Sequence, residues 1–483
     1  MSRLADRARA AVADPKLQDA LGNLTGLLSV LARSAAADPT LTERRERAKE
    51  VRRETLADLD GWLARLEAKL TEQGAVVHHA DGPSEACRVV ADLVRAEGVE
   101  VVVKGKSMAT EEIHLNRAIE AAGAEVWETD LGEYIVQLAG EPPSHIVGPA
   151  LHKRIPEIAD LFSEVVGREL PHDAEVLCAV AREVLREKFF AAGMGITGAN
   201  FAAADTGTIV LVTNEGNGRM CSSLPRIHVV IMPVEKVVPR LADVADLVPV
   251  LTRWASGQPL TTYVSMITGP ARPGDVDGPE QLHVVFLDHN RRALAGTDYE
   301  EMLACVRCGA CLNVCPVYGR IGGHAYDSVY PGPMGSVLTP LLSRGAEGHE
   351  LPDASSLCGA CTEACPVGIP LADMLVHLRA DLRRPRAAAW AIDAPRRAGR
   401  RRPSVFGLWS RAWSTPGGYR LTTATARRVA RLVARAQRRD GWVASMPGAS
   451  GWASQRDVPV PPASSFRDRW AARQRGDLAG WQG

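Results

Sequence analysis

The 483-residue sequence lacks a long apolar run and an excess of charge of either sign. No stretch approaches the roughly 18 apolar residues that suggest a membrane-spanning helix. The N-terminal residues MSRLADRARAAVADPK scatter charges where the apolar core of a secretory signal would lie. Lys and Arg number 57, as do Asp and Glu, so the whole chain offers no general attraction for a polyanion. These absences predict a cytoplasmic protein without a transmembrane segment, and they leave peripheral membrane association open.

Two glycine-containing motifs resemble nucleotide-binding loops but lack the required context. GMGITG, which begins at Gly193, matches G-x-G-x-x-G, yet a helical pattern precedes it and a strand pattern follows it. The dinucleotide fingerprint needs the reverse order, so we interpret the motif as a flexible turn from helix to strand. KGKS, which begins at Lys104, resembles a phosphate loop, but Glu100 occupies the place of its first glycine. Hydride transfer by this chain alone is therefore not predicted.

Hydrophobic periodicity and composition divide the chain into four regions. Residues 1–70 carry apolar side chains at helical spacing, whereas residues 71–290 alternate helical patterns with β-branched runs such as VEVVVKG, AEVWETD and IHVVIMPVEKVV. This alternation predicts an α/β domain with a largely parallel sheet. Residues 298–382 are cysteine-rich, and residues 383–483 form a C-terminal region rich in Arg and Trp.

Cysteine is sparse in most of the chain, but seven of the ten cysteines lie between Cys305 and Cys365. Reducing conditions favour metal ligation over disulfides for such a cluster. The run C-x-x-C-x-x-C-x-x-x-C-P from Cys305 is the bacterial ferredoxin motif, and the run from Cys358 is the same motif with Ser355 in place of its first cysteine. A structural zinc site rarely has this pattern. The two runs predict an α-helical ferredoxin-type domain that binds two [4Fe-4S] clusters.

In two-cluster ferredoxins the last cysteine of each run ligates the cluster of the other run. This rule assigns Cys305, Cys308, Cys311 and Cys365 to cluster one. It assigns Cys315, Cys358 and Cys361 to cluster two, which is one thiolate short. The fourth iron of cluster two could use a partner's ligand, no protein ligand, or one of four side chains: Ser355, Ser356, His324 and His349.

Polar residues follow several predicted strands of the α/β region. Open α/β sheets bind ligands at the carboxyl ends of their strands, so these residues predict a polar pocket. Lys104 could pair with a carboxylate or phosphate, and His145 or Glu215 could move protons, which makes these three the candidate catalytic residues. The remaining candidates are Ser107, Asn116, Asp130, Glu133, Thr197, Asn200, Asp205, Thr206, Asn214 and Asn217. Each of them also suits a structural role as a cap, a turn residue or a surface ion pair.

These motifs and several longer segments resemble the lactate-utilisation protein B family of iron–sulfur proteins. The similar segments cover most of the chain and include VKGKSMATEEIHLN, ITGANFAAADTGTIVLVTNEGN and SSLCGACTEACPVGIPL. The family's second cysteine run also has three members. The resemblance implies an α/β domain related to the sugar-phosphate isomerase and CoA-transferase-like folds, followed by the two-cluster domain. It also implies an electron-transfer subunit of an oxidoreductase complex that oxidises L-lactate to pyruvate with two companion proteins.

Two other functions stay open at this point. The iron–sulfur subunit of a glycolate-oxidase-like or heterodisulfide-reductase-like complex would share the cysteine pattern but not the TGANFAAADTG segment. A cluster-based redox sensor that binds nucleic acid would explain residues 383–439, where Arg is dense and Trp390, Trp409 and Trp413 are interleaved. The same basic stretch suits an acidic protein partner, and we expect no nucleic acid to bind.

Overall fold

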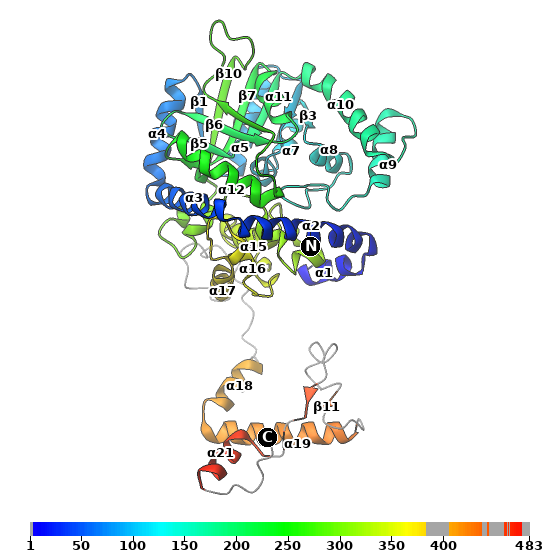
Figure 1. Cartoon of the computed structure of the whole chain (residues 1–483), viewed down its shortest axis with the longest axis vertical. Helices are drawn as coiled ribbons and strands as arrows, with labels where there is room; N and C mark the ends of the chain where they lie inside the picture. Colours follow the sequence, from blue (N-terminus) through cyan, green and yellow to red (C-terminus); the bar gives the residue numbers. More distant parts are fainter. Residues whose placement is uncertain are drawn as a thin grey trace. The chain divides into compact units, whose positions relative to one another are not determined.

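The computed structural model describes residues 3–382, 405–436, 442–443, 458–460, 462 and 464–475. The chain forms two compact units, Met1–Pro395 and Arg396–Gly483. The first unit contains the sheets of the α/β region together with the cysteine-rich region (Figure 1).

A six-stranded parallel sheet forms the centre of the first unit. Its strands are β1 (Val76–Ala80), β2 (Val101–Lys104), β3 (Glu125–Glu128), β4 (Met194–Gly198), β7 (Ile227–Pro233) and β10 (Gln281–Leu287). The strand order is β1-β10-β7-β4-β2-β3, and every neighbouring pair is parallel. Strand β7 is buried at every residue, as expected of a parallel strand that is covered on both faces.

Helices cover both faces of this sheet. They are α5 (Pro83–Ala96), α6 (Met108–Glu112), α7 (Leu115–Ala121), α8 (Leu131–Leu138), α9 (Ile155–Val166), α10 (Ala174–Ala191) and α11 (Asn217–Ser223). Successive side chains of a strand point to opposite faces. Val102 of β2 accordingly packs with α5 and α7, whereas Val103 packs with α8, α9 and α10. The predicted α/β fold with a parallel sheet is confirmed.

A smaller sheet packs against part of the main sheet. Its strands are β5 (Phe201–Ala203), β6 (Thr208–Thr213), β8 (Val237–Val238) and β9 (Tyr263–Ile267), in the order β8-β5-β6-β9. Val230 and Met232 of β7 share a core with Ala202 and Ile209 of this second sheet. Helix α12 (Val244–Ser256) follows β8 after a short 3-10 turn.

The GMGITG segment lies inside the main sheet, so its interpretation as a flexible turn is wrong. Met194–Gly198 is strand β4, hydrogen-bonded between β2 and β7. A Cβ atom at Gly195 would collide with the backbone carbonyl of Cys221 in α11. The glycine is therefore required by the close approach of a helix to the strand rather than by a bound dinucleotide.

Four helices precede the sheets: α1 (Leu4–Ala13), α2 (Pro15–Ala37), α3 (Pro39–Ala57) and α4 (Leu59–Glu72). Asp14, Asp38 and Asp58 each accept a hydrogen bond from a backbone N–H in the first turn of the next helix. In α2 and α3 the cap is followed by proline at the first helical position, where the missing N–H costs no hydrogen bond. Figure 1 shows α2 and α3 running between the α/β layers and the cysteine-rich region.

The cysteine-rich region is built from short helices joined by loops. They are η4 (Glu300–Ala304), α13 (Ala310–Asn313), α14 (Tyr318–Ile321), η5 (His324–Tyr326), α15 (Gly332–Leu342), η6 (Leu351–Asp353), α16 (Ala360–Ala364) and α17 (Leu371–Asp381). Met302, Leu338 and Leu375 of this region belong to one hydrophobic core with Val51 of α3 and Leu247 of α12. The predicted helical ferredoxin-type region thus packs directly on the elements that precede it.

Arg52 of α3 joins the α/β region to the first cysteine motif. Its side chain is 2% exposed. The guanidinium donates hydrogen bonds to the carbonyls of Val237 at 3.0 Å, Leu303 at 2.9 Å and Ala304 at 3.3 Å. One buried cation therefore satisfies backbone oxygens both of β8 and of the 3-10 helix η4 directly before Cys305.

The second unit contains α18 (Val405–Trp413), α19 (Pro416–Ala436), β11 (Trp442–Val443), β12 (Val458–Pro459) and α21 (Phe466–Gln474). Trp409 and Trp413 of α18 are exposed, and their ring centroids lie 4.7 Å apart. Trp390 and much of the arginine-rich stretch lie outside the described residues. No helix in the described part of the chain is both long and apolar enough to cross a bilayer.

Candidate functional site

The seven cysteines of the two motifs lie in two groups. Cys305, Cys308, Cys311 and Cys365 line one pocket between η4, α13 and the loop after α16. Cys315 lies close enough to Cys358 and Cys361 for negative charges on these thiols to repel one another. Cys365 of the second run therefore joins the first group, and Cys315 of the first run joins the second group. The sequence predicts these same two sets from the ferredoxin crossover rule.

The chemistry of the thiols fits the iron–sulfur clusters that the motifs predict. All seven are free, and most are buried. Burial raises the pKa of Cys361 and of Cys365 to about 11, so each would stay a neutral thiol without a nearby cation. Iron would supply that cation, because metal ligation deprotonates a coordinating thiol outright.

Backbone N–H groups point at the sulfur atoms. Arg307 N donates to Cys305 Sγ, Tyr318 N to Cys315 Sγ and Ile369 N to Cys365 Sγ, each at 3.4 Å. Hydrogen bonds to ligating sulfurs stabilise the negative charge there, and they are one of the ways in which a protein sets the potential of a cluster.

The two cysteine loops repeat the same backbone conformation. Arg307 and Gly309 flank Cys308 with φ of 63° and 78°, and Leu357 and Gly359 flank Cys358 with φ of 56° and 84°. The left-handed residues turn the chain so that its N–H groups face one side. In the second loop Leu357 N donates to Ser355 Oγ at 3.1 Å, as Arg307 N donates to Cys305 Sγ in the first. Ser355 therefore occupies the place in its loop that Cys305 occupies in the other.

The other three fourth-ligand candidates have different surroundings. The backbone N–H of Ala360 and, after it, the hydroxyl of Ser356 bond to the Cys358 sulfur and lower the pKa of that exposed thiol. His349 is exposed. His324 Nε2 lies 2.8 Å from the carbonyl oxygen of Pro142 in the α/β region.

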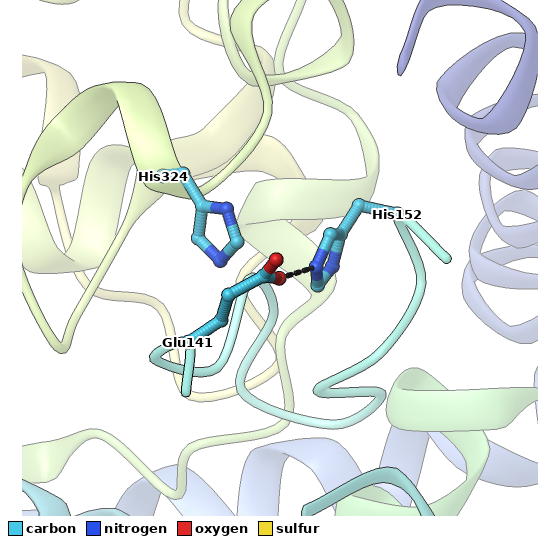
Figure 2. A group of neighbouring side chains, drawn as sticks. All are labelled: Glu141, His152 and His324. Atoms are coloured by element: carbon cyan, nitrogen blue, oxygen red, sulfur yellow. Dashed lines mark hydrogen bonds and ion pairs between the residues drawn. The ribbon is translucent and has the colours of Figure 1, made fainter. Parts of the chain in front are cut away.

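His324 also belongs to a polar group that ties the cysteine-rich region to the loop after α8 (Figure 2). Its ring meets the ring of His152 edge-on at 4.4 Å. His152 Nε2 lies 2.6 Å from Glu141, whose other oxygen pairs with Lys153 at 2.6 Å. Because Lys153 already balances the charge of this carboxylate, the group needs no ion to be stable.

A cavity of about 310 Å³ opens where strands of the main sheet end. Gly105 follows β2, Gly198 ends β4 and Pro233 ends β7, and all three line it. The candidates that line it are Ser107, Asp130, Thr197, Asn200, Asn214, Glu215 and Asn217. The candidates that do not line the cavity, among the described side chains, are Lys104, Asn116, Glu133, His145, Asp205 and Thr206. The structure thus does not bring the three candidate catalytic residues together.

Lys104 is fully buried and makes internal ion pairs. Its Nζ lies 2.6 Å from Glu111 and 2.7 Å from Glu128, and it donates to the Thr110 hydroxyl at 2.9 Å. Burial alone would lower the pKa of Lys104, but the charges of Glu111 and Glu128 raise it above its ordinary value. The ammonium is therefore charged and already neutralised, which leaves it little affinity for a further anion.

His145 lies at the contact between the α/β region and the cysteine-rich region. Its Nδ1 accepts hydrogen bonds from Val147 N and Gly148 N, so the proton of the neutral ring is on Nε2, which lies 3.1 Å from Asn313 Oδ1. Burial lowers the pKa of His145 to about 4. The ring holds α13 in place beside the cysteines.

Glu215 lies on the wall of the cavity and accepts a hydrogen bond from Leu131 N at 3.1 Å. Burial raises its pKa, and the neighbouring carboxylate of Asp130 raises it further. The carboxyl is thus poised to hold a proton closer to neutral pH than an exposed glutamate.

The sequence does not predict that three cationic side chains line the cavity: Lys106, Lys236 and Arg307. Lys106 donates to the Val147 carbonyl, and Arg307 pairs with Glu235 at 2.9 Å. Lys236 is 7% exposed, and burial together with the charge of Arg307 lowers its pKa to about 7. Lys236 sits within the β-branched run PVEKVV, where periodicity gives no signal that its side chain faces a cavity.

The cavity and the pocket of the first cysteine group share a wall. Ile146 and Arg307 line both. Arg307 directly precedes Cys308, and its guanidinium also lies over the ring of Tyr330, 4.8 Å from the ring centroid. A molecule in the cavity would therefore lie one side chain away from the first cysteine group.

Comparison with known proteins gives two family matches and close relatives. Residues 63–287 match the LUD domain, and residues 301–369 match the 4Fe-4S dicluster domain. The chain is 44% identical over 434 residues to lactate utilization protein B of Oceanobacillus iheyensis, which covers 90% of this chain and 88% of that protein. It is 42% identical over 442 residues to lactate utilization protein B of Bacillus subtilis, with the same coverage. A DUF162 family protein from Deinococcus radiodurans matches 47% of this chain and 98% of its own, at 16% identity and a TM-score of 0.26.

Proposed function

Because the chain belongs to the lactate utilization protein B family, we propose that it is the iron–sulfur electron-transfer subunit of a system that oxidises L-lactate to pyruvate. The observation that carries this proposal is the division of seven cysteines into a group of four and a group of three within one dicluster region. Each [4Fe-4S] cluster, once bound, would supply one-electron redox chemistry.

The two groups lie close together, as a short electron path requires. Burial raises the pKa of Tyr326 well above its ordinary value, and charges on Cys315 of the second group and Cys311 of the first would raise it further. Only three residues separate Cys311 from Cys315 along the chain. Most of the seven cysteines are buried, and the backbone N–H groups that face the sulfurs would stabilise their negative charge.

The conversion of lactate to pyruvate releases a pair of electrons and two protons, so a single-electron carrier must work with other components. The cavity residues of this chain could bind a ligand, but none of its described segments carries a dinucleotide fingerprint in the required context. We therefore assign the chain to a complex with two companion lactate-utilisation proteins, in which its cysteine region conducts electrons.

The test is L-lactate-dependent dye reduction by the protein reconstituted with its companions, in wild type and in Cys308→Ser. Wild type should carry roughly eight irons per chain and reduce the dye, whereas the variant should lose about half of its iron and the activity. Cys178→Ser changes an exposed cysteine outside both groups and should behave as wild type. Full dye reduction by the Cys308 variant after loss of its iron would refute the electron-transfer role.

A further inference from the structure

Lys236 carries an unpaired ammonium group in the cavity at the strand ends. It is the last residue of the 3-10 helix η1 (Val234–Lys236), and it lines the cavity while being 7% exposed. No hydrogen bond or ion pair joins its Nζ to any residue in the described part of the chain, whereas Lys106 and Arg307 are both bonded. A buried ammonium without a partner is costly, which lowers the pKa of Lys236, so an anion in the cavity would stabilise the charged form of this side chain.

Two other polar atoms of the cavity wall also lack partners among the described residues. They are the hydroxyl of Thr213 and the side-chain oxygen Oε1 of Gln258, both buried. A hydroxyl can donate or accept, and an amide oxygen accepts. An unpaired buried polar group marks a place where a ligand group or a water is expected. The cavity therefore offers one ammonium group without a bonded partner, together with a donor and acceptors for a neutral polar group.

We propose that this cavity binds a small 2-hydroxy or 2-oxo carboxylate, with the carboxylate against the Lys236 ammonium and the hydroxyl or oxo group facing the unpaired polar side chains. The choice of lactate and pyruvate as members of this class rests on the proposed function. The shared wall of Ile146 and Arg307 places the bound anion beside the pocket of Cys305, Cys308, Cys311 and Cys365.

The charges of the wall favour a monoanion over phosphate. Among the three cations of this wall, Lys236 is the one whose side chain makes no hydrogen bond or ion pair with a described residue, since Lys106 donates to the Val147 carbonyl and Arg307 pairs with Glu235. Asp130 and Glu215 line the same cavity, and their carboxyl groups would repel a dianion more strongly than a monoanion. A carboxylate matches the single unpaired ammonium in charge.

The test is calorimetric titration of the anaerobically purified full-length protein, without companions, using L-lactate, pyruvate and inorganic phosphate as separate probes. We expect L-lactate or pyruvate to bind more tightly than phosphate. Lys236→Met should weaken that binding at least about tenfold with unchanged iron content, because it removes the charge and keeps the length of the side chain. Thr213→Val, which keeps both shape and net charge, should weaken it by about threefold or more.

Lys188→Met is the matched control, because Lys188 of α10 pairs with Glu125 of β3 and lies outside the cavity. It should bind the carboxylate as wild type does. The site is wrong if neither carboxylate binds the wild type, if phosphate binds more tightly, or if both Lys236→Met and Thr213→Val bind as wild type. Absence of binding alongside intact lactate-dependent dye reduction by the complex would overturn this site alone. Binding without any such activity would overturn the electron-transfer role alone.

Discussion

His228 is a titratable side chain buried in the middle of the main sheet. It lies on β7 with no exposed surface, and its Nε2 lies 2.8 Å from the Thr197 hydroxyl. Its Nδ1 has no hydrogen-bond partner among the described residues. Burial lowers the pKa of His228 to about 3, so the ring is neutral in the folded protein at every pH near neutrality.

This histidine should make stability depend on pH. Below about pH 6.5 the unfolded chain binds a proton at His228 that the folded chain does not, so acid favours unfolding. Between pH 7 and pH 5.5 the free energy of unfolding should fall by about 1 kcal/mol through this residue. Thermal melting at the two pH values should therefore show a smaller acid shift for His228→Gln than for wild type.

The control for this measurement is His172→Gln, which changes an exposed histidine. It should keep the acid shift of the wild type, and His145 contributes equally to all three proteins. An acid shift in His228→Gln as large as in the wild type would show that His228 is not the buried neutral ring described above.

The chemistry of a residue can be inferred from the sequence, but its partners cannot. Lys104 follows the strand sequence VEVVV, which makes it a reasonable candidate for binding an anion. In the structure, however, its ammonium already forms ion pairs with Glu111 and Glu128. These carboxylates come from a helix and a strand whose relative placement periodicity does not give. Lys236 is the opposite case, because the sequence does not mark it as an anion-binding candidate. Only the fold reveals that it lines the cavity and forms no ion pair with a described carboxylate.

The two cysteine loops are a single structural element used twice. The spacing of the cysteines predicts their grouping, because the spacers set which thiols can reach a common centre. The spacing does not predict that Arg307 and Leu357 both adopt a left-handed conformation, since neither residue type favours it. This repeated conformation is what aligns Ser355 with Cys305.

The alignment leads to a prediction for Ser355. A serine oxygen or a water holds iron less firmly than a thiolate, so brief oxidation of the wild type should convert cluster two to a [3Fe-4S] form with its oxidised-state EPR signal. Ser355→Cys completes the four-cysteine run and should suppress that signal. Ser356→Cys, one residue away beside Cys358, should leave it unchanged.

Suppression by Ser356→Cys but not by Ser355→Cys would contradict the alignment of the two loops. If the oxidised wild type keeps all its iron and gives no three-iron signal, the fourth iron of cluster two has a strongly bound ligand. The prediction that this iron is weakly held would then be wrong.

In the first unit, the α/β region and the cysteine-rich region pack together as one compact unit rather than as two separate domains. They share a hydrophobic core, and Arg52, His145 and His324 each bond across the contact. The alternation of helices and strands predicts the sheet and its covering helices, and the strand ends predict where the cavity lies. The shared wall at Arg307 is not predictable, because it depends on how the two regions pack.

This packing leads to the central claim, that electrons from lactate reach the cysteine region of this chain. The most direct measurement is EPR spectroscopy of the oxidised protein with its two companions, recorded before and after L-lactate is added without oxygen. The account predicts that signals of reduced [4Fe-4S] clusters appear, that pyruvate forms, and that both are lost in Cys308→Ser. Formation of pyruvate while the clusters of this chain stay oxidised would contradict it.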